Sequence, residues 1–581
     1  MAHSLIVRRD IEFLLYDWLG VDRVADRETV DAFLDLSEKI AVEAFLPHYK
    51  QADVEEPELT ADGVHICPAI GSALRQYADL GLFAAGFDEA LGGLGLPYSA
   101  CAASFAYFAS ANLATSAYPM LTVANARLIA TFGTEAQIAH FALPQIEGRW
   151  FGTMCLSEPQ AGSSLADVRT RAEPDGDDEL GPRYRLVGNK MWISGGDQDA
   201  SENIVHLVLA KVAARNEALP EGTNGLSLFI VPKRLGDGTP NDIAVAGLNH
   251  KMGYRGTANC LLNLGESSGA VGWIVGQPGE GLRQMFQMMN EARISVGLGA
   301  AAVGYRGYRL SVAYAQERLQ GRPVGVRTGG QVPIIEHPDV KRMLLTQKAY
   351  VEGALALCLY AARLVDMEDE ADSASLLGLL TPVVKTWPSE YALAANDIAI
   401  QVHGGYGYTR DFDVEQLWRD NRLNPIHEGT TGIQAADLLG RKILRDGSGL
   451  KVLHSRIAAC VGRADSFAEL ARHGGALSSA WTQVREVVDK LVAGQPARLL
   501  DNATPFLWAF GHVVVGWLWL EQAVLATENQ AESGERDGFL SGKSRAARFF
   551  FECELPKVDG WLAAVSAASD VAAGAPLATF E

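Results

Sequence analysis

Short β-rich runs are confined to residues 151–278, and helical periodicity surrounds them on both sides. The runs RYRLVGNKMWISGG, IVHLVLAKV and LSLFIVPK are bounded by Gly, Pro and polar segments, as strands are. The flanking residues 1–150 and 279–445 repeat apolar residues every three or four positions, which is typical of helices that pack on one face. This order predicts a mainly α protein with a central β-domain.

The same pattern predicts four parts. They are an N-terminal helical domain with an extension (residues 1–150), a β-domain that is a small barrel or sheet (151–278), a C-terminal four-helix bundle (279–445) and an extra helical domain (450–581). A chain of 581 residues needs several cores, because single cores stop growing beyond about 250–300 residues. Inside the bundle, Pro388 and Ser389 predict the start of a helix, and Gly404 predicts its end.

Charge and cysteine usage exclude several classes of protein. The formal net charge of −20 disfavours nucleic acid or an anionic membrane as a partner, because both need clustered Lys and Arg. The seven cysteines form no C-x-x-C pair, so we expect no metal site and no disulfide framework, and a cytoplasmic location. Two segments, AEPDGDDELGPR and RNEALPEGTNG, are expected to be exposed turns.

Residues 502–520, NATPFLWAFGHVVVGWLWL, carry no formal charge and approach the length of a membrane span. Their Asn, Pro and His, and the Glu that ends the run, favour a buried helix of a soluble domain instead. These residues therefore disfavour membrane contact, although length alone does not separate the two interpretations.

Three segments carry residues with chemical potential. MCLSEPQAGSSLADVRT (residues 154–170) joins an apolar run to a Gly/Ser turn, and KMWISGG (190–196) places Trp192 beside Ser194. The third, IQVHGGYGYTRDFDVEQLWRDNRLNPIHEGTTGIQ (400–434), ends with Glu428 on a turn of small residues. Each is weak alone: a strand Trp is more often core, a Gly pair often caps a helix, and Glu favours a helix N-terminus.

In this order and spacing the segments resemble the acyl-CoA dehydrogenase family, over roughly residues 40–445. The shared pattern is T/S-E-P-x-A-G-S, then K-x-W-I-T/S, then Q-x-x-G-G-x-G-Y, then E-G-T. The first 40 and last 130 residues exceed the shortest members and resemble a larger bacterial branch that includes 3-methylmercaptopropionyl-CoA dehydrogenases.

The resemblance implies an FAD enzyme that converts an acyl-CoA to the trans-2-enoyl-CoA in fatty acid β-oxidation. Glu428 would take the α-proton, the β-hydride would go to flavin N5, and an electron-transfer flavoprotein would receive the electrons. Burial raises a carboxylate pKa toward the working pH, and hydrogen bonds to the thioester carbonyl stabilise the enolate. Some members carry the base just before the Arg of the first bundle helix, here Ala292; Glu291, one residue back, is a weak rival.

The family motifs also assign binding residues. The residues expected to contact FAD are Met154, Leu156, Ser157, Trp192, Ser194, Arg318, Gln401, Gly404, Gly405 and Thr430. Those expected near the acyl-CoA are Ser163, Arg293, His427 and Gly429. Arg318 and the Gln401–Gly405 turn would meet FAD across a subunit interface, and the extra C-terminal domain predicts a homodimer.

Four departures from the family pattern bear on the substrate more than on the reaction. His427 stands where Tyr is common, either as a shape-filling wall or as a titratable neighbour of Glu428. Gly432 replaces a common Gln, Asn290 replaces a common Asp, and the RLQGRPVGVRTGG segment lacks the usual Phe.

Three alternative functions are also compatible with these features. One is an acyl-CoA oxidase that passes electrons to oxygen, and another is a long-chain enzyme anchored by residues 502–520. The third is a non-catalytic DNA-binding relative, which the acidic charge and the absence of a dense basic run disfavour.

Overall fold

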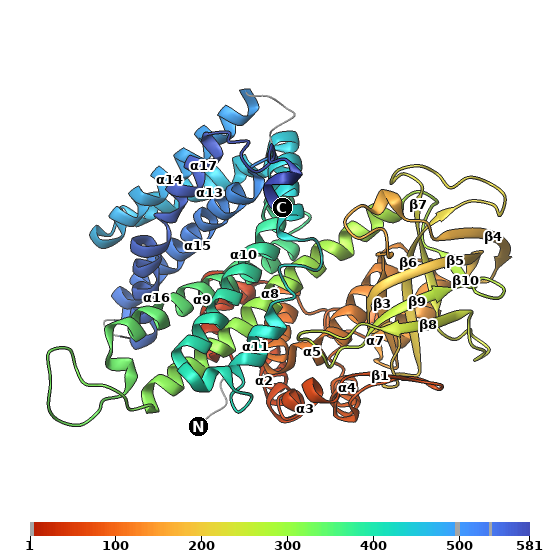
Figure 1. Ribbon diagram of the computed structural model, residues 1–581, viewed down its shortest axis with the longest axis horizontal. Helices are drawn as coiled ribbons and strands as arrows, with labels where there is room; N and C mark the ends of the chain where they lie inside the picture. The colour runs from red at the N-terminus through yellow and green to blue at the C-terminus, as the bar shows by residue number, and fades with distance from the viewer. Residues whose placement is uncertain (1–4, 494–499, 534–536) are drawn as a thin grey trace. The chain divides into compact units, whose positions relative to one another are not determined.

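The computed structural model describes residues 5–493, 500–533 and 537–581, which group into two units by their contacts (Figure 1). One unit is Ala25–Ala292, and the other joins the residues up to Val24 to Arg293–Glu581. Helix α8 (Gly281–Glu317) runs across the division. The described residues are mainly helical with one large sheet, so the predicted fold class is confirmed.

The Ala25–Ala292 unit begins with helices whose ends carry standard signals. Asp26 caps α2 by accepting a hydrogen bond from the Thr29 N–H at 2.8 Å, and Pro68 opens α4 at the first helical position. The helices of this unit are α2 (Arg27–Ile40), η3 (Ala41–Phe45), α3 (Tyr49–Val54), α4 (Pro68–Asp79), η4 (Glu89–Leu91), α5 (Tyr98–Phe132), α6 (Glu135–Gln137), η5 (Ile138–Ala142), α7 (Leu143–Ile146) and η6 (Leu165–Asp167).

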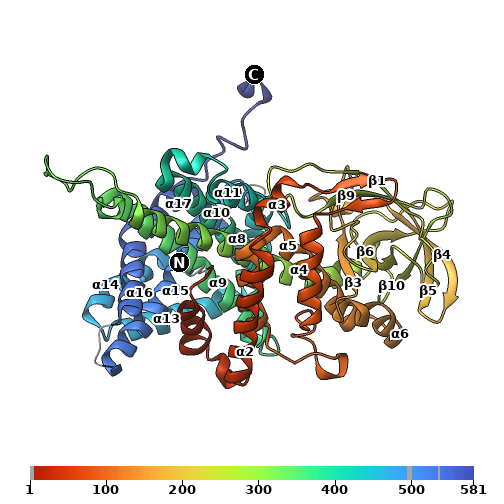
Figure 2. The same cartoon turned by 90° about the horizontal axis from the view of Figure 1, so that it is seen from below.

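The predicted β-rich runs form one eight-stranded sheet in the order β10-β7-β6-β4-β5-β9-β8, with β3 parallel to β6 (Figure 2). Strand β10 also pairs with β5, so β5, β10, β7, β6 and β4 close into a ring. The strands are β3 (Trp150–Cys155), β4 (Arg171–Asp178), β5 (Gly181–Ser194), β6 (Asn203–Val212), β7 (Leu226–Pro232), β8 (Ile243–Leu248), β9 (Asn259–Leu264) and β10 (Ala270–Ile274). A hairpin of β1 (Glu58–Thr60) and β2 (Gly63–His65) lies in a stretch expected to be helical from the sequence.

The expectation of an exposed turn at AEPDGDDELGPR is wrong for most of that segment. Its residues form β4 and the start of β5, and only the short connection between these strands is a turn. Pro174 falls at a register shift, where the loss of an N–H is tolerated. Asp175 accepts hydrogen bonds from Arg183 and Arg185 across the hairpin at 3.1 and 2.7 Å. The acidic residues therefore belong to a solvated strand pair.

The regular elements of the second unit's described residues are helices, apart from an isolated bridge between Leu319 and Pro333, and α13 to α17 gather beside α9 and α10 (Figures 1 and 2). Its helices are α1 (Arg8–Glu12), η1 (Phe13–Trp18), η2 (Val21–Arg23), the rest of α8, η7 (Ile334–Glu336), α9 (Pro338–Val365), α10 (Ala371–His403), η8 (Gly404–Tyr408), α11 (Val414–Asn421), α12 (Thr431–Ala436), η9 (Asp437–Asp446), α13 (Ser448–Ala464), α14 (Ala468–Ala493), α15 (Ala503–Ser533), α16 (Gly538–Phe549), η11 (Phe550–Glu554), α17 (Lys557–Ser566) and η12 (Leu577–Phe580).

The predicted helix start at Pro388 is wrong, because α10 begins at Ala371 and contains Pro388 in its interior. A proline in a helix frees the carbonyl four residues earlier, here that of Val384. Helix α8 packs tightly at this point: a Cβ built on Gly297 would come within 2.0 Å of the Val384 oxygen. The predicted end is confirmed, since Gly404 follows the last helical residue with φ +61°.

The apolar run at 502–520 lies in α15, which is long and apolar enough to cross a membrane. Its most apolar window is 83% buried inside the protein. Trp519 donates to the Ala349 oxygen of α9 at 3.1 Å, and Trp387 of α10 bonds His512 at 3.2 Å. The helix is therefore the core of the C-terminal helices, as the sequence favoured.

Candidate active site

The loop that carries Glu428 joins α11 to α12 and has an unusual backbone. Glu428 has φ +53° and Gly429 has φ +89°, both in the left-handed region. The Gln434 side chain of α12 donates to the backbone carbonyl oxygen of Glu428 at 2.9 Å and fixes this turn. A Cβ on residue 429 would come within 2.6 Å of Gln434 Nε2 and displace that amide, and the φ of +89° itself favours glycine. Residues of α12 thus hold the acid in a conformation that costs about 1–3 kcal/mol.

Two opposing effects set the ionisation of Glu428. Burial raises the pKa of its carboxyl, while the nearby Arg293 and Lys385 act to lower it. Arg293 itself is buried and donates to Asp437 at 3.2 Å. Its guanidinium therefore pairs with Asp437 and also acts on Glu428, and its expected place near the acyl-CoA stays a prediction.

His427 is held by a chain of buried amides. Asn421 donates to the Ala300 carbonyl at 3.2 Å, which fixes its amide, and Asn424 then donates to the Asn421 oxygen at 2.9 Å. The remaining Asn424 oxygen lies 3.1 Å from His427 Nε2, so Nε2 carries the proton. Burial, helped by Lys385, lowers the pKa of His427 to about 3. The imidazole is thus neutral across the physiological pH range. This favours the interpretation of His427 as a shape-filling wall over its interpretation as a titratable neighbour of Glu428.

Several buried polar atoms around Glu428 have no hydrogen-bond partner among the described residues. They are Arg293 Nε, Lys385 Nζ and Gln434 Oε1. Buried polar groups are nearly always paired, so a cluster of unpaired ones indicates a place that a ligand or water completes.

The other residues of this unit that were expected to bind FAD are exposed to solvent. Gln401, Gly404, Gly405 and Thr430 are exposed, and a Cβ on either glycine would meet no atom within 4 Å. Arg318, just past the end of α8, is also exposed. These positions leave room for a partner or ligand to approach the main chain.

In the other unit, the first two motifs are joined by the sheet. The Met191 N–H donates to the backbone carbonyl oxygen of Ser157 at 3.0 Å. Trp192 lies at a register shift of β5 against β9, with φ +65°, and its side chain is 58% exposed. A bulge of this kind re-aims a side chain, here an indole toward solvent. Ser194 accepts a hydrogen bond from Asn259 at 3.4 Å.

The other expected residues of the first motif line the same turn. Met154 lies on β3, and Leu156 and Ser157 follow the end of this strand. All three are half-buried, whereas Ser163 is exposed. An apolar edge, two hydroxyls and an open indole therefore lie on one structural unit, a combination that suits a flat aromatic ring.

A buried ion pair beneath these residues was not singled out from the sequence. Lys190 is fully buried and donates to Glu158 Oε1 at 2.9 Å and to the Leu156 and Leu209 oxygens at 3.1 and 2.8 Å. Glu158 also accepts from the Thr170 hydroxyl at 2.5 Å. Both residues belong to the motifs, since Glu158 follows Ser157 and Lys190 lies two positions before Trp192. This proximity was the signal in the sequence that could have identified the pair.

The rival base Glu291 is engaged elsewhere. Its carboxylate accepts a hydrogen bond from Arg127 at 2.9 Å, and Tyr98 donates to its backbone oxygen at 3.4 Å. A carboxylate paired with a half-buried guanidinium, as here, is a weaker base than an unpaired one. This arrangement favours Glu428.

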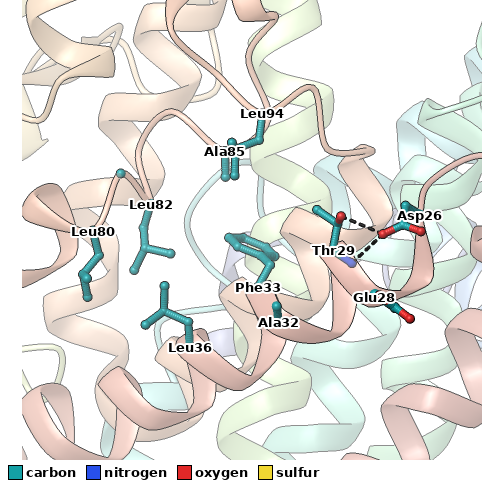
Figure 3. Close-up of a pocket in the computed structure, with 11 residues that line it drawn as sticks. Asp26, Glu28, Thr29, Ala32, Phe33, Leu36, Leu80, Leu82, Ala85 and Leu94 are labelled. Atoms are coloured by element: carbon teal, nitrogen blue, oxygen red, sulfur yellow. Dashed lines mark hydrogen bonds between the residues drawn. The ribbon is translucent and has the colours of Figure 1, made fainter.

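A hollow of about 500 Å³ in the Ala25–Ala292 unit is formed by α2 and the segment around residues 80–94 (Figure 3). Phe33, Leu36 and Leu82 point into it, while the Asp26–Thr29 cap lies at its edge. Its lining contains none of the expected site residues, and the candidate site is elsewhere.

The described residues also contain no group of three or more His, Cys, Asp or Glu that could hold a metal ion.

Family models match almost the whole chain in order. "Acyl-CoA dehydrogenase, N-terminal domain" matches residues 27–149, "middle domain" 153–266 and "C-terminal domain" 279–443. "Acetyl-CoA dehydrogenase C-terminal like" matches residues 453–576.

Relatives align over nearly the full length. The 3-methylmercaptopropionyl-CoA dehydrogenase of Ruegeria pomeroyi is 36% identical, with 93% of this chain and 94% of the relative covered. A butyryl-CoA dehydrogenase of Syntrophomonas wolfei is 32% identical, and both chains are covered completely.

Two solved structures share the fold. Caenorhabditis elegans ACDH-11 in complex with C11-CoA has a TM-score of 0.81 at 21% identity, covering 98% of this chain and 95% of the other. An acyl-CoA dehydrogenase from Bacillus anthracis complexed with FAD has a TM-score of 0.75 at 20% identity, covering 93% and 88%.

Proposed function

The chain belongs to the acyl-CoA dehydrogenase family, and on that premise we propose that Glu428 is the base that starts α,β-dehydrogenation of an acyl-CoA thioester. Membership makes the protein an oxidoreductase that acts on CH–CH donors with FAD as its cofactor. The observation that carries the proposed role is the buried Glu428 carboxylate, whose pKa is raised, on a left-handed turn that Gly429 and the Gln434 side chain hold in place.

The chemistry begins at the thioester α-carbon, whose proton is only weakly acidic. A carboxylate whose pKa is raised by burial is a stronger base than one in water and better matched to that proton. The Glu428 N–H has no acceptor among the described residues, so it can donate to the thioester carbonyl. Such a donor stabilises the negative charge that develops on that oxygen as the proton leaves. Glu428 thus contributes through both its side chain and its backbone.

The residues present fit the cofactor. The open indole of Trp192 and the hydroxyls of Ser157 and Ser194 suit the isoalloxazine ring, with Met154 and Leu156 as its apolar neighbours. We assign Thr430, Gln401, Gly404, Gly405 and Arg318 to the rest of the dinucleotide. FAD, when bound, supplies the acceptor for the β-hydride. The Lys190–Glu158 pair holds the residues that orient the ring.

The substrate is an acyl-CoA thioester, with Ser163, Arg293, His427 and Gly429 assigned near it. The relatives are named for different acyl groups, 3-methylmercaptopropionyl and butyryl, and the C. elegans structure holds C11-CoA. The neutral His427 offers this substrate a fixed wall with no titrating charge. The acyl group itself is to be identified by a panel of short, medium, long, branched and 3-methylthiopropionyl thioesters.

We further propose that an electron-transfer flavoprotein takes the electrons and that the protein is a cytoplasmic homodimer that acts in β-oxidation. We also propose that its domains are residues 1–150, 151–278, 279–445 and 450–581. The exposed Arg318 and the exposed Gly404–Gly405 turn support a subunit interface at these positions. Light scattering that gives a monomer or a tetramer would contradict the homodimer.

Anaerobic stopped flow tests the proposed function. The yellow protein is mixed with each acyl-CoA of the panel, and loss of flavin absorbance is followed with enoyl-CoA formation. We expect bleaching by at least one thioester, persistence of the reduced form in air, and reoxidation when electron-transfer flavoprotein is added. Rapid reoxidation by air would identify an oxidase, and no bleaching by any thioester would overturn the proposal.

A further inference from the structure

One fully buried lysine near the proposed base lacks the partners that other buried lysines have. Lys385 lies within α10 with 0% exposure, and its Nζ has no hydrogen-bond partner among the described residues. By contrast, Lys190 bonds Glu158 and two carbonyls, and Lys543 contacts Asp10 at 2.5 Å and Glu352 at 2.9 Å. A buried charge without a partner is costly, so its retention at this position calls for a role.

The charges that face Lys385 come from three parts of the chain. Glu428 on its loop and Glu390 on α10 attract the ammonium, and Arg293 on α8 repels it. Glu390 already accepts a hydrogen bond from the Thr431 hydroxyl at 2.5 Å, and Arg293 already pairs with Asp437. Glu428 makes no ion pair of its own among the described residues, which leaves Lys385 as its uncommitted counter-charge.

Charged groups of the C-terminal helices meet other residues of α9 and α10. His512 bonds Trp387, and Glu554 and Lys557 bond Tyr350. Burial lowers the pKa of Lys385 to about 8, so the amine is still mostly protonated at neutral pH. The lysine therefore acts on Glu428 as a cation.

We infer that Lys385 is a positioning residue for the reaction, whose ammonium keeps the Glu428 carboxylate ionised in the resting protein. The inference rests on the proposed role of Glu428 as the base. Burial alone favours the neutral acid, which cannot accept a proton, and the lysine opposes that tendency. Once Glu428 has taken the α-proton, the same cation favours release of that proton and resets the base.

Lys385→Met tests the inference, because it removes the charge and nearly keeps the volume. The rate of flavin reduction by a fixed acyl-CoA is measured against pH under anaerobic conditions. Loss of a cation raises the pKa of Glu428, so the acid limb of the rate profile should move to higher pH, by about one pH unit or more. If the midpoint of the variant lies one pH unit above that of the unmodified protein, the variant should be about tenfold slower at pH values below both midpoints. The variant should recover its rate at high pH, where Glu428 is ionised with or without the lysine.

Two further variants make the readout specific. Lys385→Arg keeps the charge and should keep the midpoint near that of the unmodified protein. Lys451→Met removes an exposed cation of α13 from the same unit and should leave the profile unchanged. An unshifted midpoint in Lys385→Met, or a uniform loss of rate at all pH values, would overturn the inference.

If Lys385→Met does not fold, the unmodified holoprotein decides the question. Infrared difference spectra against Glu428→Gln report the protonated carboxyl of Glu428 as pH falls. We expect it to be ionised at pH 7, and a protonated carboxyl there would overturn the inference. If Glu428→Gln itself keeps near-normal flavin reduction, the proposed function fails; if Glu428→Gln is inactive and only the Lys385 result is negative, this inference alone fails.

Discussion

Backbone strain marks the residues to which the sequence assigns chemistry. Among the described residues, four that are not glycine have positive φ: Trp192, Tyr254, Glu428 and Ala568. Two of these are the proposed base and the indole assigned to the flavin. Such conformations cost about 1–3 kcal/mol each and persist only where the surroundings impose them. The strain at Glu428 and Trp192 is therefore consistent with positions fixed for function.

Replacing Glu428 by Gln tests the base directly. The shape of the side chain is kept, so the protein should fold, stay yellow and bind acyl-CoA, while flavin reduction falls by at least about 10²–10⁴-fold. Stopped-flow absorbance measures this. Glu291→Gln is the matched control: it weakens the pair with Arg127 and should lower stability while reduction stays within a few-fold of normal. The reverse pattern would move the base to Glu291.

Gly429→Ala tests whether the turn itself matters. A Cβ on residue 429 would come within 2.6 Å of Gln434 Nε2, so this amide must move away from the Glu428 backbone oxygen that it bonds. The φ of +89° adds a cost of about 1–2 kcal/mol for a residue other than glycine. We expect a lower melting temperature and slower flavin reduction together. Gly462→Ala in α13, where a Cβ meets nothing within 4 Å, should be neutral or slightly stabilising. Equal effects of both substitutions would contradict a special role for this turn.

At the scale of elements, a buried ion pair joins two strands that carry the first two motifs. Lys190 on β5 reaches Glu158 just past β3 and the Leu209 carbonyl of β6. Glu158 also accepts hydrogen bonds from the Arg169 and Thr170 N–H groups at 2.7 and 3.0 Å. Its pKa is lowered by Lys190 and these donors, which outweigh burial. The pair thus fixes the strand ends on which the ring-binding residues stand.

Lys190→Met should therefore loosen the cofactor site. It leaves the Glu158 carboxylate buried without its cation, and removing one partner of a buried pair typically costs about 3–5 kcal/mol. We expect a lower free energy of unfolding in urea and faster loss of FAD on dilution. Lys211→Met is the control, since the Lys211 ammonium on β6 donates to the Ala166 carbonyl rather than to a buried acid. A loss no larger than that of the control would refute the structural role.

At the scale of the whole molecule, the first helices belong with the last. Asp10 of α1 contacts Lys543 of α16, and Trp18 stacks on Tyr360 of α9 with ring centroids 5.6 Å apart. Lys543 also contacts Glu352, so one buried ammonium joins three segments that are distant in sequence. The N-terminal extension and the C-terminal helices therefore complete one core in this unit.

Lys543→Met should destabilise this unit more than a surface change does. It leaves two buried carboxylates, Asp10 and Glu352, beside each other, and we expect a loss of about 3–5 kcal/mol. Thermal unfolding of the holoprotein measures the change. Lys490→Met, on an exposed position of α14, should stay within about 0.5 kcal/mol. A small change for Lys543→Met would show that the network is replaceable.

Local patterns of this chain determined its fold class, its strands and its three motifs. Period-two and period-3.6 repeats are properties of neighbouring residues, so β5, β6, β7 and α8 could be predicted directly. The same approach failed at α10 and β4. In α10, the Val384 carbonyl that Pro388 leaves without its helical donor lies against Gly297 of α8, and in β4, Asp175 bonds two arginines across the hairpin. Propensity is weak wherever packing can override it.

The tertiary structure alone decided the ionisation and partners of the site residues. The sequence named Glu428 and His427 and implied that burial would raise the pKa of Glu428. It did not show that the pKa of His427 would be lowered, nor that Lys385 and Arg293 would face the acid. It also gave no sign that Asp10 would meet Lys543. The physical reason is the same throughout. Periodicity is written in adjacent residues, whereas burial and charge depend on which distant residues the folded chain brings together.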